Sequence, residues 1–212
     1  MLSFRRRISY GIGGAIFAVK EAAYAVFVLL FYTQVVGLSG FYTGAALFIA
    51  VLFDCVSDPL IGAWSDSLRS RWGRRHPFML IGCVFMGVGF LGLFAPPAAI
   101  ADSQLQLAAW LLFWTLWIRS LVSVFSIPHQ ALSAEMTRDY HDRSRILGTR
   151  LVIMGLATVL IPAIALTLLF DERAGVDGRF VQANYPIYGI ASCIITWLVG
   201  LACIWMTREY AT

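Results

Sequence analysis

Six long apolar stretches constrain the fold of this chain more than any other feature of its sequence. An α-helix needs roughly 20 mainly apolar residues to cross a bilayer, and it satisfies its own backbone hydrogen bonds there. The stretches cover residues 8–36, 39–64, 77–98, 105–127, 148–170 and 186–206. We therefore expect an all-α, multi-pass membrane protein in which residues 1–212 form one bundle of six spans.

The composition argues against other classes of protein. Hydrophobic residues make up 59% of the chain and charged residues only 13%, where about 25% is usual for a soluble domain. The net charge of +4 does not indicate a nucleic-acid partner, because the basic residues stand in short clusters between apolar stretches. The sequence shows no nucleophile-base motif, metal-ligand spacing or phosphate-binding loop, so we expect neither an enzyme nor a cofactor. The lipid bilayer is the partner that the composition predicts.

The basic residues predict the orientation of the spans, because cytoplasmic loops and ends retain Lys and Arg. Twelve arginines fall on one side, and only Arg173 and Arg179 fall on the other. The twelve are Arg5, Arg6, Arg7, Arg69, Arg71, Arg74, Arg75, Arg138, Arg143, Arg145, Arg150 and Arg208. We expect both termini in the cytoplasm, as an even number of spans allows, and a location in the plasma membrane, here a bacterial inner membrane.

Five charged residues lie inside the predicted spans, where each costs about 2.5–3.5 kcal/mol even on a lenient insertion scale. They are Lys20, Glu21, Asp54, Asp58 and Arg119. Asp54 and Asp58 are four residues apart, so both carboxylates lie on one face of a helix. If the five groups meet, three acids and two bases leave one negative charge for a sodium ion or a proton to neutralise.

Two alternatives stay open for these charges. They could form a structural network that only orients the helices. Lys20 could pair with Asp54 when no cation is bound, or it could stay with its neighbour Glu21. We favour cation binding at Asp54 and Asp58, since like charges one turn apart are costly unless a cation lies between them.

The segment FDCVSDPLIGAWSDSLRSRWGRRHPF, from Phe53 to Phe78, resembles part of a known family. It is similar to the second helix and following loop of the glycoside-pentoside-hexuronide:cation symporters, the melibiose-permease group of the major facilitator superfamily. Two further segments, FYTQVVGLSG and IPHQALSAEMTRDYHDRSRILGTR, resemble the same group. The Gly/Asp/Arg-rich loop between helices 2 and 3 of that superfamily is matched by Gly62, Asp66, Arg69, Gly73, Arg74 and Arg75.

The resemblance covers the whole chain but only the amino-terminal half of a family member, which has twelve helices in two bundles. It implies a six-helix bundle built as 3+3 inverted repeats, whose partner is a missing carboxy-terminal half or a second copy of the chain. It also implies that Asp54 and Asp58 bind the coupling cation, sodium or a proton. The residues assigned to a substrate or charge network are Lys20, Glu21, Arg119 and Arg150.

The loop around Asp66 has two readings. As a gate, the Asp66 carboxylate would accept hydrogen bonds from arginines and hold the inward ends of the helices together in one state. As a topological signal, the loop would only keep its positive charge on one side. The second basic segment, residues 135–145, either docks on this loop or is solvated.

Together these features predict a secondary active transporter that couples a cation to the symport of a small solute, a sugar or glycoside. Ala18, Ser126 and Gln130 stand where melibiose permeases carry Asp, Asp and Trp, so a galactoside is not the expected solute. The alternatives are a carrier of a lipid or other non-sugar solute, a half-size carrier that works as a homodimer, and a truncated membrane protein that does not transport.

Overall fold

The computed structural model describes residues 4–67, 75–137, 139–172 and 175–210, without the side chains of residues 66, 67 and 210. Within this part of the chain, six helical segments are long and apolar enough to cross a membrane, the number that the sequence predicts. Five of them are continuous α-helices: α3 (Gly40–Ser67), α4 (His76–Leu93), α5 (Gln104–Met136), α6 (Tyr140–Leu168) and α7 (Asn184–Thr207). Short 3-10 turns accompany them: η3 (Ala98–Ile100), η4 (Gly178–Phe180) and η5 (Arg208–Tyr210).

The first span is not the single helix that the sequence predicts. It consists of α1 (Phe4–Gly11), α2 (Gly14–Ala22) and two π-helical turns, η1 (Ala23–Val28) and η2 (Phe31–Val35). Gly13 lies in this break and brings its backbone close to α5, because a Cβ there would overlap the His129 imidazole. His129 Nε2 also lies 3.0 Å from the Tyr10 carbonyl oxygen.

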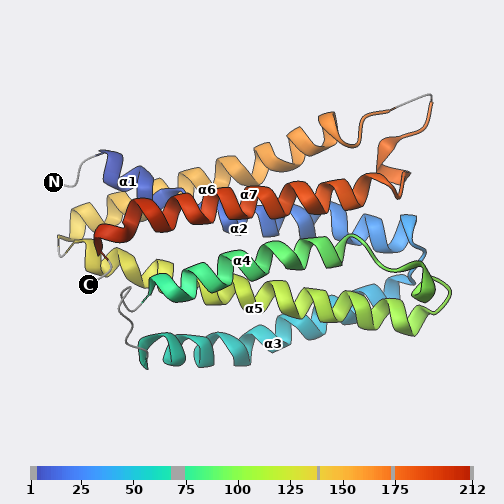
Figure 1. Ribbon diagram of the computed structural model, residues 1–212, viewed down its shortest axis with the longest axis horizontal. Helices are drawn as coiled ribbons and strands as arrows, with labels where there is room; N and C mark the ends of the chain where they lie inside the picture. Colours follow the sequence, from blue (N-terminus) through green and yellow to red (C-terminus); the bar gives the residue numbers. More distant parts are fainter. Residues whose placement is uncertain (1–3, 68–74, 138, 173–174, 211–212) are drawn as a thin grey trace.

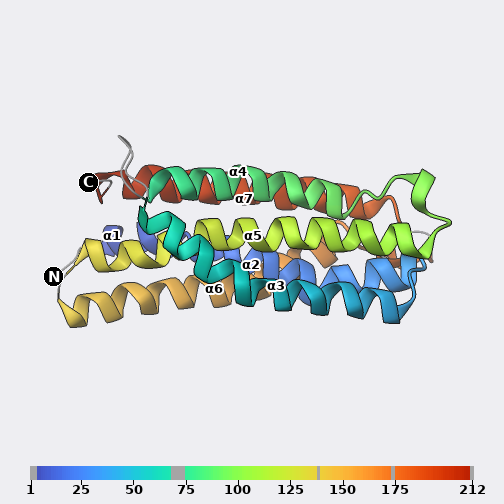
Figure 2. The same ribbon diagram turned by 90° about the horizontal axis from the view of Figure 1, so that it is seen from below.

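The spans pack in three layers, which Figure 2 shows from the side. Helices α4 and α7 form one outer layer, α5 and the first span form the middle layer, and α3 and α6 form the other outer layer. Helix α3 packs along α5, α6 packs along α1 and α2, and α4 packs along α7. If the first three spans are matched in order to the last three, the first span corresponds to α5, α3 to α6 and α4 to α7. The contact of α3 with α5 then corresponds to the contact of α6 with the first span, as expected for 3+3 inverted repeats.

Both ends of the chain lie at the same end of the bundle (Figure 1). This end holds the basic residues 5–7 in α1, Arg75 before α4 and Arg208 after α7. The opposite end holds Arg179 in η4. The separation of these basic residues agrees with the predicted topology. Which side of the membrane this end faces stays a prediction.

Proline ends the third span earlier than the apolar pattern predicts. Helix α4 stops at Leu93 rather than at residue 98. Pro96 and Pro97 cannot donate to a helical ladder, and each disfavours the helical conformation in the residue before it. The chain therefore turns through η3 before α5 begins.

The fourth and fifth spans extend beyond their apolar stretches. Helix α5 continues through Pro128 to Met136 and α6 starts at Tyr140, so residues 135–145, predicted as a loop, are mostly helical. An apolar run measures the thickness of the hydrocarbon layer, whereas a capped helix can continue outside it. The Asp139 carboxylate accepts the N–H of Asp142 at 2.9 Å, and this hydrogen bond lowers the pKa of Asp139.

Helices α4 and α5 lie very close together where glycines of α4 face α5, and Gly82 marks the closest approach of the two backbones. A Cβ on Gly82 would come within 2.7 Å of the backbone nitrogen of Phe125 and 2.9 Å of the carbonyl oxygen of Leu121. These are backbone atoms that no side-chain rotation can move away. Small residues allow this kind of close approach between helices in membranes.

The outer layer of α3 and α6 is the least covered part of the bundle. Few residues in the most apolar windows of α6 and α3 are buried, and the others are partly or largely exposed. The exposed side chains of α6 include Leu151, Val152, Leu156, Val159, Leu160, Ile164 and Leu168. Lipid or a further protein surface must cover this layer in a membrane.

Candidate functional site

Two matched pairs of polar residues join α3 to α5 in the middle of these spans. On α3, Asp54 and Asp58 are one turn apart, and on α5, Arg119 and Ser123 have the same spacing. The Arg119 Nε donates to Asp54 Oδ2 at 2.8 Å, and Nη2 of the same guanidinium contacts the same oxygen. The Ser123 hydroxyl donates to Asp58 Oδ1 at 2.5 Å. The two helices are therefore joined by one ion pair, Asp54–Arg119, and one hydrogen bond, Ser123–Asp58. We call these four residues the ladder.

The ladder is mostly shielded by the bundle. The side chains of Asp54 and Arg119 are 22% and 19% exposed, and Ser123 is buried. The second oxygen of Asp54, Oδ1, is buried without a hydrogen-bond partner among the described residues, and so is the hydroxyl of Ser57. A buried carboxylate oxygen without a partner is costly unless a cation, a proton or water reaches it.

The charges of the ladder do not balance. Arg119 neutralises Asp54, whereas no lysine or arginine in the described part of the chain pairs with Asp58. The uncompensated negative charge that the sequence predicts therefore belongs to Asp58. Ser123 stabilises that charge by a charge-assisted hydrogen bond but does not cancel it.

Lys20 and Glu21 form a separate ion pair in α2. The Lys20 side chain is 10% exposed, and its ammonium lies 4.3 Å from the centre of the Phe17 ring. Of the two partners that the sequence left open for Lys20, the structure shows Glu21. Arg119, not Lys20, is the partner of Asp54.

Arg150 lies away from the start of its helix, because α6 begins ten residues earlier at Tyr140. Its backbone oxygen and side chain face Gly14 in α2, and its Nε is buried without a hydrogen-bond partner among the described residues. No contact within the described part of the chain brings Arg150 to Asp54 or Asp58. It belongs to the region around the break of the first span.

Most of the predicted gate lies outside the described residues. This holds for Arg69, Gly73, Arg74 and the side chain of Asp66. Gly62 is half-buried on α3, and a Cβ there would lie 3.8 Å from Ile127 of α5.

Arg75, the last residue of the predicted gate, is described. Its Nε donates to Glu135 Oε1 at 2.7 Å. Glu135 belongs to the second basic segment, so this contact shows that the second segment docks on the end of the first loop. Glu135 is itself exposed, and so are Asp139, Arg143 and Arg145, so the segment is solvated outside this contact.

The family model described as MFS/sugar transport protein matches residues 9–212. The chain belongs to this family. The inner membrane symporter YicJ of Escherichia coli K12 is 27% identical over 99% of the chain and 44% of the relative. The putative glycoside/cation symporter YagG of the same organism is 26% identical over 100% of the chain and 44% of the relative. The sodium-dependent lysophosphatidylcholine symporter 1 of Xenopus tropicalis is 29% identical over 77% of the chain and 31% of the relative.

The chain spans less than half the length of these relatives of the MFS/sugar transport family. The match confirms the predicted family and the multi-pass membrane class. The relatives' names describe symporters, and they differ in the solute that they mention.

Ser123 is the site residue that the sequence analysis missed in this member of the MFS/sugar transport family. Serines are common inside membrane helices, where their hydroxyls usually bond to their own helix, as Ser120 does with the carbonyl of Leu116. The available signal was the spacing: Ser123 follows Arg119 by four residues, just as Asp58 follows Asp54. Two helices with the same spacing of polar residues can pair them in register.

Proposed function

We propose that the chain forms the cation-binding bundle of a secondary active symporter, with Asp58 and Asp54 as the cation ligands. The observation that carries this proposal is the uncompensated Asp58 carboxylate beside a buried, unpartnered oxygen of Asp54. An ionised pair of this kind inside a bilayer attracts a cation or a proton. Transport, rather than an enzymatic reaction, is the activity that this arrangement supports.

The surrounding oxygen atoms suit a hard cation such as sodium. Carboxylate and hydroxyl oxygens are available from Asp54, Ser57, Asp58 and Ser123. In our proposal the cation binds Asp58 and the free oxygen of Asp54, and it weakens the hold of Arg119 on Asp54. Protonation of Asp58 would remove the same charge, so sodium and proton coupling remain the two candidates.

The proposed solute is a sugar or glycoside. The family description and the glycoside/cation relative support this class. A lipid-like solute is the second candidate, because another relative is named as a lysophosphatidylcholine symporter. We propose that four residues of the charge network contact or orient the solute: Lys20, Glu21, Arg119 and Arg150.

The proposed partner of the bundle is a second six-helix bundle that covers α3 and α6. These helices form the least covered layer, and Asp54 and Asp58 belong to one of them. Transporters of this fold rock one bundle against another around a site at their interface. A carboxy-terminal half or a second copy of the chain would supply the opposing wall. A bacterial inner membrane with cytoplasmic termini is the proposed location.

Cation binding tests the proposal directly. The purified chain is titrated with sodium, and binding is followed by the change in tryptophan fluorescence; a parallel pH titration with infrared detection of protonated carboxyls tests the proton alternative. We expect Asp58→Asn to abolish the response and Asp54→Asn to weaken it. Asp102→Asn, a matched change in an exposed turn, should bind as the wild type does.

Transport tests the second half of the proposal. Cells that express the transporter are supplied with labelled sugars, glycosides or lysophospholipids under a sodium or proton gradient. Gradient-driven accumulation of one class identifies the solute, and it should be lost in Asp58→Asn. Cation binding that survives in both aspartate variants would remove these residues from the coupling role.

A further inference from the structure

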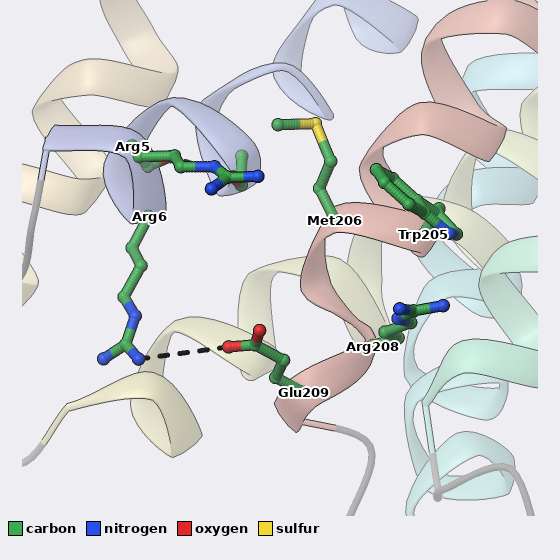
Figure 3. A pocket seen from close by; sticks show the side chains of 7 residues that line it. Arg5, Arg6, Trp205, Met206, Arg208 and Glu209 are labelled. Carbon is green, nitrogen blue, oxygen red and sulfur yellow. Dashed lines mark hydrogen bonds and ion pairs between the residues drawn. The ribbon is translucent and has the colours of Figure 1, made fainter.

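A polar pocket lies at the end of the bundle where the two chain ends meet. Figure 3 shows Arg5 and Arg6 reaching into it from α1, opposite Trp205, Arg208 and Glu209 at the end of α7. The cavity has a volume of about 330 Å³. It is far along the spans from Asp54 and Asp58, so it is distinct from the proposed cation site.

The charges that line the pocket do not balance. Three arginines but only one glutamate line it. Glu209 lies 3.9 Å from Arg6, and both side chains are more than half exposed, so this is a weak ion pair. In the described part of the chain, no acidic side chain pairs with Arg5 or Arg208. The pocket therefore keeps an excess of about two positive charges.

The position of the pocket indicates where its anion comes from. Trp205 is 60% exposed near the end of a membrane span, where tryptophans anchor a helix at the level of the lipid headgroups. The Arg208 guanidinium lies over the Trp205 ring, 5.2 Å from its centre, which holds it at the same depth. The pocket thus opens at the height of lipid phosphates rather than deep in the aqueous phase.

We propose that this pocket binds a phosphate group, carried by an anionic phospholipid of the adjacent leaflet. Arginine is suited to phosphate because its planar donors bind two oxygens at once. Basic pockets between spans are a recognised form of site for anionic headgroups. Bound there, the lipid would link the start of α1 to the end of α7, in addition to the weak Arg6–Glu209 pair.

A purely topological role for these arginines makes a different prediction. If the positive charge only orients the spans, any arginines at this end of the bundle are equivalent. If the pocket is a site, Arg5 and Arg208 are not interchangeable with Arg143 and Arg145, which are exposed on α6 at the same end and do not line it.

The test uses the purified full chain and native mass spectrometry to count retained lipids. Phosphatidylglycerol, phosphatidylcholine and inorganic phosphate are each added at the same concentrations. We expect retention of phosphatidylglycerol over phosphatidylcholine, and we expect Arg5→Gln/Arg208→Gln to weaken it roughly tenfold or more. Arg143→Gln/Arg145→Gln, with the same change in net charge, should retain the lipid as the wild type does.

Further arms make each outcome decisive. Arg5→Lys/Arg208→Lys keeps the charge but loses the two-oxygen geometry, so it should retain the lipid less well than the wild type. Displacement of the lipid by inorganic phosphate would show that the phosphate alone is recognised; retention against phosphate would show that the lipid is the source. No preference for phosphatidylglycerol in the wild type, or equal losses in the two glutamine variants, would overturn the proposal, and circular dichroism reports whether each variant is folded.

Discussion

At the scale of single residues, the Asp54–Arg119 ion pair holds α3 to α5 and also belongs to the proposed cation site. Asp54→Asn leaves the mostly buried Arg119 guanidinium without a charged partner, and we expect a loss of stability of roughly 3 kcal/mol. The double variant Asp54→Asn/Arg119→Gln removes both charges and should recover most of that loss. Thermal unfolding followed by circular dichroism measures both effects. A single variant as stable as the wild type would contradict the ion pair.

Ser123 offers a sharper test of the cation site, because its change removes no charge. Ser123→Ala deletes the hydroxyl that orients the Asp58 carboxylate, and we expect cation affinity to fall roughly 10- to 100-fold, as for other residues that orient a ligand. Ser120→Ala is the matched control, since the Ser120 hydroxyl bonds to its own helix. Equal affinities in the two variants would show that Ser123 does not position Asp58. Sodium titration of the purified variants is the measurement.

At the scale of helices, the contact between α4 and α5 depends on the missing side chain of Gly82. Gly82→Val places methyl groups against the backbone of Phe125 and Leu121, so the helices must separate. We expect a loss of at least about 1–3 kcal/mol, the usual effect of overpacking. Gly155→Val on α6 meets nothing within 4 Å and should be close to neutral. Unfolding midpoints of the two variants decide whether the approach is as close as the structure shows.

The break in the first span gives a second prediction at this scale. A bond from His129 Nε2 to the Tyr10 carbonyl requires the proton on Nε2, and the imidazole also stacks on the Tyr10 ring at 4.3 Å. His129→Phe keeps a ring for stacking but loses the donor, so α1 should loosen by about 0.5–1.5 kcal/mol. Faster amide hydrogen exchange in residues 5–13 would report this. His141 is exposed on α6, so His141→Phe should leave amide exchange in residues 5–13 unchanged. Unchanged exchange in His129→Phe as well would show that the His129–Tyr10 hydrogen bond does not hold α1 in place.

At the scale of the whole molecule, the prediction concerns topology. The two chain ends share one end of the bundle with most of the described arginines. A reporter that is active only in the cytoplasm should therefore work when fused after Arg75 or Thr212 and fail when fused near Asp177. Activity at Asp177 would invert the orientation. The positive-inside rule predicts the sign of this result.

The sequence by itself determined the class of this protein, the number of its spans and the family. Apolar length and the clustering of charges are local properties, and a bilayer converts them into spans with little help from tertiary contacts. Asp54 and Asp58 stood out as candidate site residues, because charge inside a span is costly wherever it occurs. The helix ends were less certain: prolines and caps, rather than hydropathy, decided where α4, α5 and α6 begin or end.

Only the tertiary structure decided how the charges pair. Arg119 and Ser123 lie 65 residues from Asp54 and Asp58, and their alignment depends on how α3 packs along α5. Tertiary packing also decided three other features. These are the pairing of Lys20 with Glu21 rather than Asp54, the break of the first span near His129, and the arginine pocket between α1 and α7. Each of these features depends on the distances between side chains on different helices. Those distances are set by the register and depth at which the helices pack. Periodicity along one helix carries no information about its register against another.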